Sequence, residues 1–167
     1  MNKTLIIGLG NPILGDDGVG WVVAQEVQRQ ISSFAFRPPS VFVECFALAG
    51  ISLMEQMIGY ERVILIDSLN TGNYAQGEVV TFSLDSLEDL VHGHSASAHD
   101  LSLKNALKLG RSMGADLPQD EDILIVAIEA AHVYDFSEEL TPAINTAVPV
   151  AVQCVLDLLK IEEGARI

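Results

Sequence analysis

The stretch TLIIGLGNPILGDDGVG, residues 4–20, decides the fold, because an apolar strand runs directly into a glycine-rich turn where a helix begins. Its first two glycines have the spacing of the dinucleotide-binding motif G-x-G-x-x-G. The third glycine position, however, is Ile13, and Pro12 lacks the N–H that would bind a pyrophosphate. Asp16 and Asp17 then place negative charge where a phosphate would lie. The turn is therefore expected to bind a cation rather than a phosphate.

Outward from this turn, apolar β-branched runs alternate with stretches of helical period, which is typical of an α/β sandwich with a largely parallel sheet. We predict strands over residues 4–8, 41–47, 62–66, 78–84 and 123–128, and helices over about 18–31, 51–58, 101–113 and from 141 onward. The polar segment 68–77 is too short for a helical crossover, so the strand after it is expected to run antiparallel or along the edge. A mixed sheet of about five strands follows.

The last helix has recognisable start signals and one internal irregularity. Thr141 followed by Pro142 is a favourable pair for the N-cap and the first helical position. Pro149 lies inside the apolar periodic stretch that follows, and a proline in a helix interior removes a hydrogen bond. We therefore expect this helix to be kinked or broken near Val148.

Length and charge limit the classes of function. The 167 residues suit a single domain spanning 1–167, and no apolar run is expected to approach the ~18 to 20 residues that cross a bilayer. The N-terminus lacks the layout of a secretion signal, which makes the cytoplasm the default. Cys45 and Cys154 lie far apart in apolar segments and predict two buried thiols. A net charge of −14 argues against nucleic acid and anionic membranes as partners.

Candidate functional residues cluster where strands are predicted to end. Ligands of open α/β sheets bind beyond the carboxyl ends of the strands. Asp16 and Asp17 follow the first strand, and Asp67 closes the third. An ionised carboxylate at such a position loses hydration, so it needs a cation or N–H donors as partners. Capping of the following helix is the simpler explanation for Asp16, and an Asx-turn or a cap would be the simpler one for Asp67.

The four histidines are not equivalent. His92 and His94 lie in a Gly/Ser-rich segment and are better explained as exposed loop residues, and His132 as a polar loop residue near Glu129. His99 stands just before a predicted helix, where the backbone is fixed enough to hold a ligand. Two carboxylates and one imidazole form a ligand set suited to Zn, Ni, Mn or Fe. The residues alone thus indicate a metal-assisted hydrolase.

Four segments in this order resemble the hydrogenase maturation endopeptidases: GLGNPILGDDGVG at 8–20, VILIDSLN at 63–70, SAHDLSL at 97–103 and LTPAI at 140–144. The resemblance covers nearly the whole chain. It implies a three-layer α/β/α sandwich that removes the C-terminal extension from the precursor of a nickel-iron hydrogenase large subunit after nickel insertion. It also implies a monomer.

Carried over by motif, the metal-contacting and catalytic residues would be Asp17, Asp67 and His99, with Gly10, Asn11 and Asp16 in support. Some family members have Glu where this chain has Asp17, and the shorter side chain keeps the charge. Nickel is expected to arrive with the substrate, and other divalent metals could occupy the same ligands. Bound nickel would thus be recognised before the tail is cut.

Two other classes of function remain open at this stage. A cysteine peptidase would pair Cys45 with His99, but Cys45 follows Glu44 within a predicted strand, with no helix N-terminus to lower its pKa. Activity that survives a thiol-alkylating agent would argue against it. A nickel-binding chaperone would inspect the precursor without cutting it, and the precursor's mass would then stay unchanged.

Overall fold

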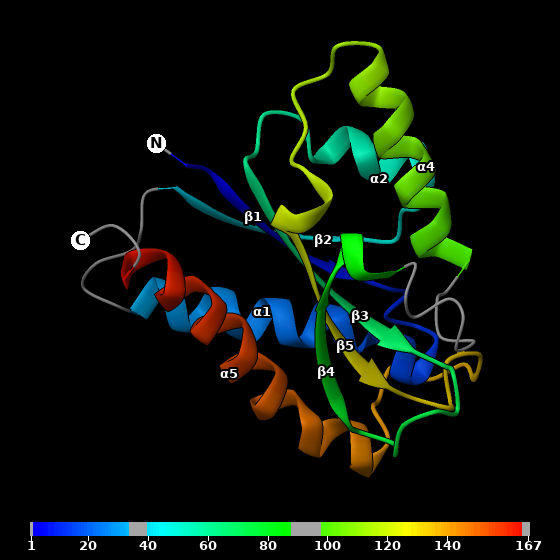
Figure 1. Cartoon of the computed structure of the whole chain (residues 1–167). Helices are drawn as coiled ribbons and strands as arrows, with labels where there is room; N and C mark the ends of the chain where they lie inside the picture. The colour runs from blue at the N-terminus through cyan, green and yellow to red at the C-terminus, as the bar shows by residue number, and fades with distance from the viewer. Residues whose placement is uncertain (1, 34–39, 88–97, 165–167) are drawn as a thin grey trace.

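The structure, a computed structural model, describes residues 2–33, 40–87 and 98–164, without the side chains of 98–101 and 161–164. Its centre is a five-stranded sheet in the order β2-β1-β3-β5-β4 (Figure 1). The strands are β1 (Thr4–Leu9), β2 (Val41–Phe46), β3 (Arg62–Leu69), β4 (Val79–Ser83) and β5 (Ile123–Glu129). The β1, β2, β3 and β5 pairs are parallel, and β4 pairs antiparallel with β5 at the edge, which confirms the predicted mixed sheet.

Helices cover both faces of this sheet and make the three-layer sandwich (Figure 1). The helices of the described chain are α1 (Val19–Ser33), α2 (Gly50–Gln56), α4 (Ala98–Ser112) and α5 (Pro142–Gly164), with short 3-10 turns η1 (Gly15–Gly18), η2 (Leu84–Ser86) and η3 (Asp120–Asp122). Helices α1 and α5 lie on one face, and α2 and α4 on the other. The predicted α/β/α architecture is therefore confirmed.

Alternation along the central strands explains the two layers, because successive side chains of a strand point to opposite faces. Ile64 and Ile66 of β3 belong to the core beneath α1 and α5, whereas Val63 and Leu65 belong to the core beneath α2 and α4. All four are at most 1% exposed. A strand buried on both faces reads as a continuous apolar run, which is how VILI appears in the sequence.

Helix α1 packs unusually close to the sheet, and glycines make this possible. A Cβ added to Gly20 would lie 2.3 Å from the Leu9 carbonyl oxygen and 2.4 Å from the Ile66 carbonyl oxygen. One added to Gly8 would lie 2.5 Å from the Gly20 carbonyl oxygen. The glycines of residues 4–20 thus serve close contact between backbones, and this contact brings the start of α1 to the carboxyl ends of β1 and β3.

Two predicted boundaries differ from the structure in ways that affect the site. Strand β3 continues to Leu69, so Asp67 lies within the strand, opposite Ala127 of β5, and does not close it. Pairing with β5 extends β3 three residues beyond the apolar run that ends at Ile66. Helix α4 begins at Ala98, about three residues earlier than predicted, so the backbone of His99 is in its first turn.

Helix α5 begins at Pro142 as predicted. Of the expected kink or break near Val148, the break is wrong, because the helix continues through Pro149 to Gly164. Buried side chains on both sides of the proline, Ile144, Ala147, Ala151 and Val155, pack on the sheet and on α1. This packing keeps the helix continuous despite the lost hydrogen bond.

The length and composition of α5 also correct the expectation about apolar runs. Pro142–Lys160 spans 19 residues with a mean hydropathy of 1.5, which by these measures alone could cross a membrane. Within the fold this stretch forms part of the layer that covers the sheet, as core helices do. The two cysteines are a smaller correction: both are free thiols and half-buried rather than fully buried.

Candidate functional site

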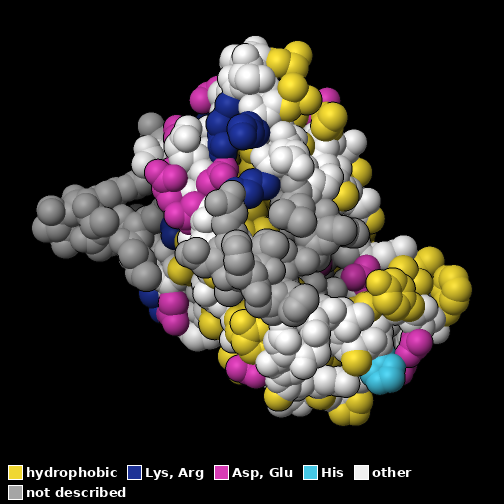
Figure 2. Space-filling view, turned by 45° about the vertical axis from the view of Figure 1, so that its right-hand side comes forward, with side chains coloured by type: hydrophobic (Ala, Val, Ile, Leu, Met, Phe, Trp, Pro, Cys, Tyr) yellow, Lys and Arg dark blue, Asp and Glu magenta, His cyan; other side chains and the backbone are white. Residues whose placement is uncertain are grey.

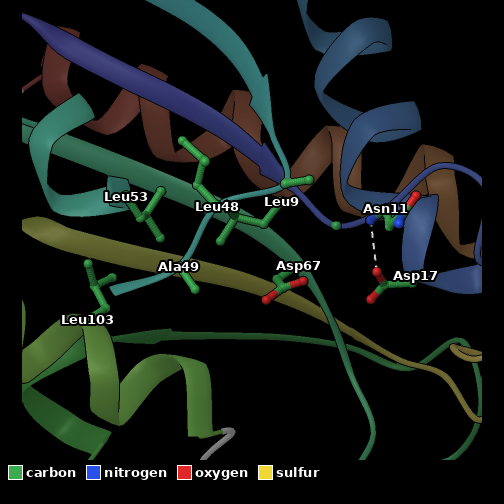
Figure 3. Close-up of a pocket in the computed structure, with 10 residues that line it drawn as sticks. Leu9, Asn11, Asp17, Leu48, Ala49, Leu53, Asp67 and Leu103 are labelled. Atoms are coloured by element: carbon green, nitrogen blue, oxygen red, sulfur yellow. Dashed lines mark hydrogen bonds between the residues drawn. The ribbon is translucent and has the colours of Figure 1, made fainter. Parts of the chain in front are cut away.

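A cavity of about 260 Å³ opens beyond the carboxyl ends of β1, β2 and β3. Figure 3 shows its two unlike walls. Asn11, Asp17 and Asp67 lie on one side, and leucine and alanine side chains on the other. The apolar wall comes from the end of β1, the segment between β2 and α2, and helices α2 and α4: Leu9, Ala47, Leu48, Ala49, Leu53 and Leu103. Asp17 and Asp67 thus lie in one cavity at this sheet edge, and their functional roles stay a prediction.

Asp17 is fixed by hydrogen bonds to both of its carboxylate oxygens. The backbone N–H of Asn11 donates to Oδ2 at 2.8 Å, and the Ser68 hydroxyl donates to Oδ1 at 3.0 Å. Gly10 makes the tight turn possible: its φ is +129°, and a Cβ there would lie 1.9 Å from the Asp17 carbonyl oxygen. The Asn11 side chain accepts the Ile13 N–H at 3.2 Å, which shapes the same turn. Each carboxylate oxygen has lone pairs left to accept or coordinate.

Ser68 links the two acids of the cavity. Its backbone N–H donates to Asp67 Oδ1 at 2.8 Å, while its hydroxyl donates to Asp17 Oδ1. This bond reaches the next residue and not the one two positions on, so it is not the Asx-turn considered for Asp67. Asp67 also lines the cavity. Sequence reasoning did not single out Ser68, although it lies inside the quoted VILIDSLN segment.

Asp16 has a different role from Asp17. It is fully buried, and its carboxylate accepts the Thr141 N–H and the Thr141 hydroxyl, each at 2.7 Å. It therefore anchors the residue before α5. The structure thus gives the Asp16 carboxylate another role than capping the following helix, namely holding Thr141.

His99 lies in the first turn of α4, four residues before the cavity residue Leu103, but its side chain is outside the described part of the chain. His92 and His94 lie wholly outside the described residues. Among the side chains that are described, no three His, Cys, Asp or Glu residues form a group that could hold a metal ion. The third member of the expected ligand set thus stays a prediction.

The surroundings of His132 and Cys45 indicate no catalytic role for either residue. His132 is exposed and its Nδ1 lies 2.8 Å from an Asp135 oxygen, as the loop interpretation expects. Burial and the neighbouring Glu44 carboxylate raise the pKa of the Cys45 thiol, which disfavours the nucleophilic thiolate. The cysteine peptidase alternative therefore lacks support.

One buried acid was missed by sequence reasoning. Glu129 at the end of β5 is 3% exposed and accepts hydrogen bonds from the Thr71 N–H and hydroxyl and from the Gly72 N–H. It holds the segment after β3 in place. The signal was present, since Glu129 ends the apolar run ILIVAI as Asp67 follows VILI.

Comparison with known proteins assigns a family to this architecture. Residues 48–158 match the family model described as hydrogenase maturation protease, HycI. The hydrogenase expression/formation protein HupD of Thiocapsa roseopersicina is 22% identical over 94% of this chain and 67% of its own length.

Solved structures agree in fold. The hydrogenase maturating endopeptidase HybD from E. coli has a TM-score of 0.74 at 22% identity, covering 96% of this chain and 93% of that one. The NiFe hydrogenase maturation protease HybD from Thermococcus kodakarensis has a TM-score of 0.73 at 25% identity, covering 93% of this chain and 98% of that one.

Proposed function

Because this chain belongs to the hydrogenase maturation protease family, we propose that its cavity grips the nickel of a hydrogenase precursor while the tail is cut. The family's proteases process the C-terminal end of the hydrogenase large subunit, and the chain is a peptidase of this kind. The finer proposal concerns substrate recognition: nickel carried by the large-subunit precursor is bound by Asp17, Asp67 and His99.

One observation carries this proposal: Asp17 and Asp67 line the same cavity and share Ser68 as a hydrogen-bond donor. Carboxylate and imidazole ligands together suit a borderline divalent ion such as nickel. A ligand set that is incomplete without the substrate's own ligands would admit the tail only after the metal has been inserted. Other divalent metals would compete for the same groups.

Peptide hydrolysis needs two proton movements at this place. Water loses a proton as its oxygen attacks the scissile carbonyl carbon, and the leaving nitrogen gains one as the C–N bond breaks. A carboxylate of the cavity can accept the first proton, or the nickel of the substrate can acidify the water. The apolar wall formed by Leu48, Leu53 and Leu103 offers a surface for aliphatic parts of the tail.

Three accompanying expectations are proposed with the function. The chain acts as a single domain, residues 1–167, and as a monomer. It works in the cytoplasm. Its partner is the large-subunit precursor rather than nucleic acid or membrane, which the net charge of −14 supports.

The test is cleavage of a nickel-loaded large-subunit precursor, followed by mass measurement before and after incubation. We expect the wild-type chain to remove the tail, and Asp17→Ala, Asp67→Ala and His99→Ala each to abolish removal, a loss of at least about 10³-fold, while the circular dichroism spectrum is kept. Asp122→Ala is the matched control, because this acid is exposed in η3, where β5 begins. It should cleave like wild type.

Two results would change the assignment. Full cleavage by His99→Ala would remove His99 from the site. An unchanged precursor mass with the wild-type chain, together with tight binding of the precursor, would favour the nickel-binding chaperone.

A further inference from the structure

Two aromatic side chains are exposed to an unusual degree near the site. Tyr134 and Phe136 are 79% and 85% exposed, and Ile13 is 47% exposed. We call these three residues the aromatic rim. Large apolar side chains in such positions favour contact with another molecule, because burying them there releases water from apolar surface. Figure 2 shows hydrophobic side chains gathered at one edge of the molecule, beside the histidine and acidic side chains.

Backbone hydrogen bonds tie the two segments of the rim together. The Ser137 N–H donates to the Ile13 carbonyl oxygen at 3.1 Å, and the Gly15 N–H donates to the Ser137 carbonyl oxygen at 2.8 Å. The Asp16 N–H donates to the His132 carbonyl oxygen at 3.0 Å. The exposed aromatics thus stand on a segment fastened at both ends to the turn after β1.

The same turn supplies the polar wall of the cavity. Asn11 and Asp17 line the cavity, and Ile13 lies between them in sequence. The aromatic rim and the polar wall of the cavity are thus joined through one turn, residues 11–17. The cavity, at about 260 Å³, can hold only a few residues of a substrate, whereas stable protein recognition buries roughly 800 Å² on each partner.

The charge around the rim indicates the chemistry of the partner. Asp135, Glu138 and Glu139 are exposed beside Tyr134 and Phe136. An apolar patch bordered by carboxylates is complementary to an apolar patch bordered by Lys or Arg, and it repels an acidic face.

We propose that the aromatic rim docks the folded body of the substrate protein, the hydrogenase large-subunit precursor, through an apolar patch flanked by basic residues, while the cavity receives its tail. This rests on the proposed function for the identity of the partner. Docking on the rim contributes affinity and does not take part in hydrolysis. Large aromatic residues are frequent among the few that dominate binding at interfaces.

The test compares the double variant Tyr134→Ser/Phe136→Ser with wild type in cleavage of the nickel-loaded precursor. We expect KM to rise about tenfold or more with kcat unchanged, since the change removes only binding contacts. Tyr134→Phe/Phe136→Tyr keeps two aromatic rings and should restore KM. Met113→Ser is the matched control, because Met113 is also 79% exposed but follows the far end of α4.

Equilibrium binding of the same precursor separates failure of the docking site from failure of the proposed function. If wild type cleaves and the double variant has the same KM, the docking site is refuted while the peptidase assignment stands. If wild type binds without cleaving, the function fails, and an approximately tenfold weaker binding by the double variant still supports the rim. Equal binding by the two proteins overturns it.

Discussion

Gly10 and Gly20 position Asp17 because neither residue has a Cβ atom. Gly10 lets the chain turn at φ +129° against the Asp17 backbone, and Gly20 brings α1 against Leu9 and Ile66. Because Asp17 lies between these two glycines, its place depends on backbone contacts that no other residue type permits.

Gly20→Ala should lower the free energy of unfolding by about 2 to 4 kcal/mol, because its Cβ would overlap two carbonyl oxygens that belong to the sheet. Chemical denaturation measures this. Val22→Ala on the exposed side of α1 is the control and should change stability by no more than about 0.5 kcal/mol. A Gly20→Ala protein as stable as wild type would show that α1 can move away from the sheet at little cost.

Single residues also show where sequence reasoning reached its limit. Asp17 and Asp67 could be predicted as a pair, because a polar residue after an apolar strand reports the sheet edge. Ser68 could not, since one serine in a loop-like segment has many possible partners. The partner of Asp16 is 125 positions away, and no local pattern identifies it.

At the scale of elements, the buried carboxylate of Asp16 joins η1 to the start of α5. Asp16→Ala removes both hydrogen bonds and Thr141→Ala removes the hydroxyl bond alone, so each should lower the free energy of unfolding by about 1.5 to 3 kcal/mol, with Asp16→Ala at the upper end. The double variant should lose less than the sum, with a coupling of about 1 kcal/mol or more. Denaturant titration of all four proteins gives this value.

The matched cycle pairs Asp16→Ala with Thr146→Ala. Thr146 also belongs to α5, but its hydroxyl donates to the Pro142 carbonyl oxygen within the same helix. These two changes should add to within about 0.5 kcal/mol. Equal coupling in both cycles would mean that Asp16 acts on α5 as a whole and not through Thr141.

Elements were predictable in type and order because their apolar periods differ, and β4 was predictable as antiparallel because its connection is short. Continuity of α5 through Pro149 was not predictable. The hydrogen bond lost at Pro149 is a local effect that the sequence shows directly. The packing that outweighs this loss comes from strands and a helix far away in the chain.

For the whole molecule, the net charge of −14 predicts how salt concentration changes thermal stability. Like charges repel in the compact state, and the Debye length falls from about 30 Å at 0.01 M salt to about 8 Å at 0.15 M. Raising NaCl over this range should therefore raise the midpoint of thermal unfolding. KCl in the same series is the control for a specific sodium effect. A falling midpoint would mean that favourable ion pairs outweigh the repulsion.

Strand order is a property of the whole molecule that the sequence predicted only in part. The parallel arrangement follows from alternating strands and helices. The position of β1 between β2 and β3, however, depends on which face of the sheet each crossover helix covers. For the same reason the lining of the cavity was not predictable, because its apolar wall combines residues from β1, α2 and α4 that have no common pattern in the sequence.

The hydrogen bonds between Asp16 and Thr141 also determine when, during synthesis of the chain, the site can form. While the chain is being synthesised, the turn after β1 leaves the ribosome long before Thr141 does. Until then the Asp16 carboxylate lacks the partner that buries it, and the segment carrying Tyr134 and Phe136 cannot be closed against the turn. A newly made molecule therefore completes the turn that carries Asp16 and Asp17 only after Thr141 has left the ribosome, so shorter growing chains cannot yet act on a precursor.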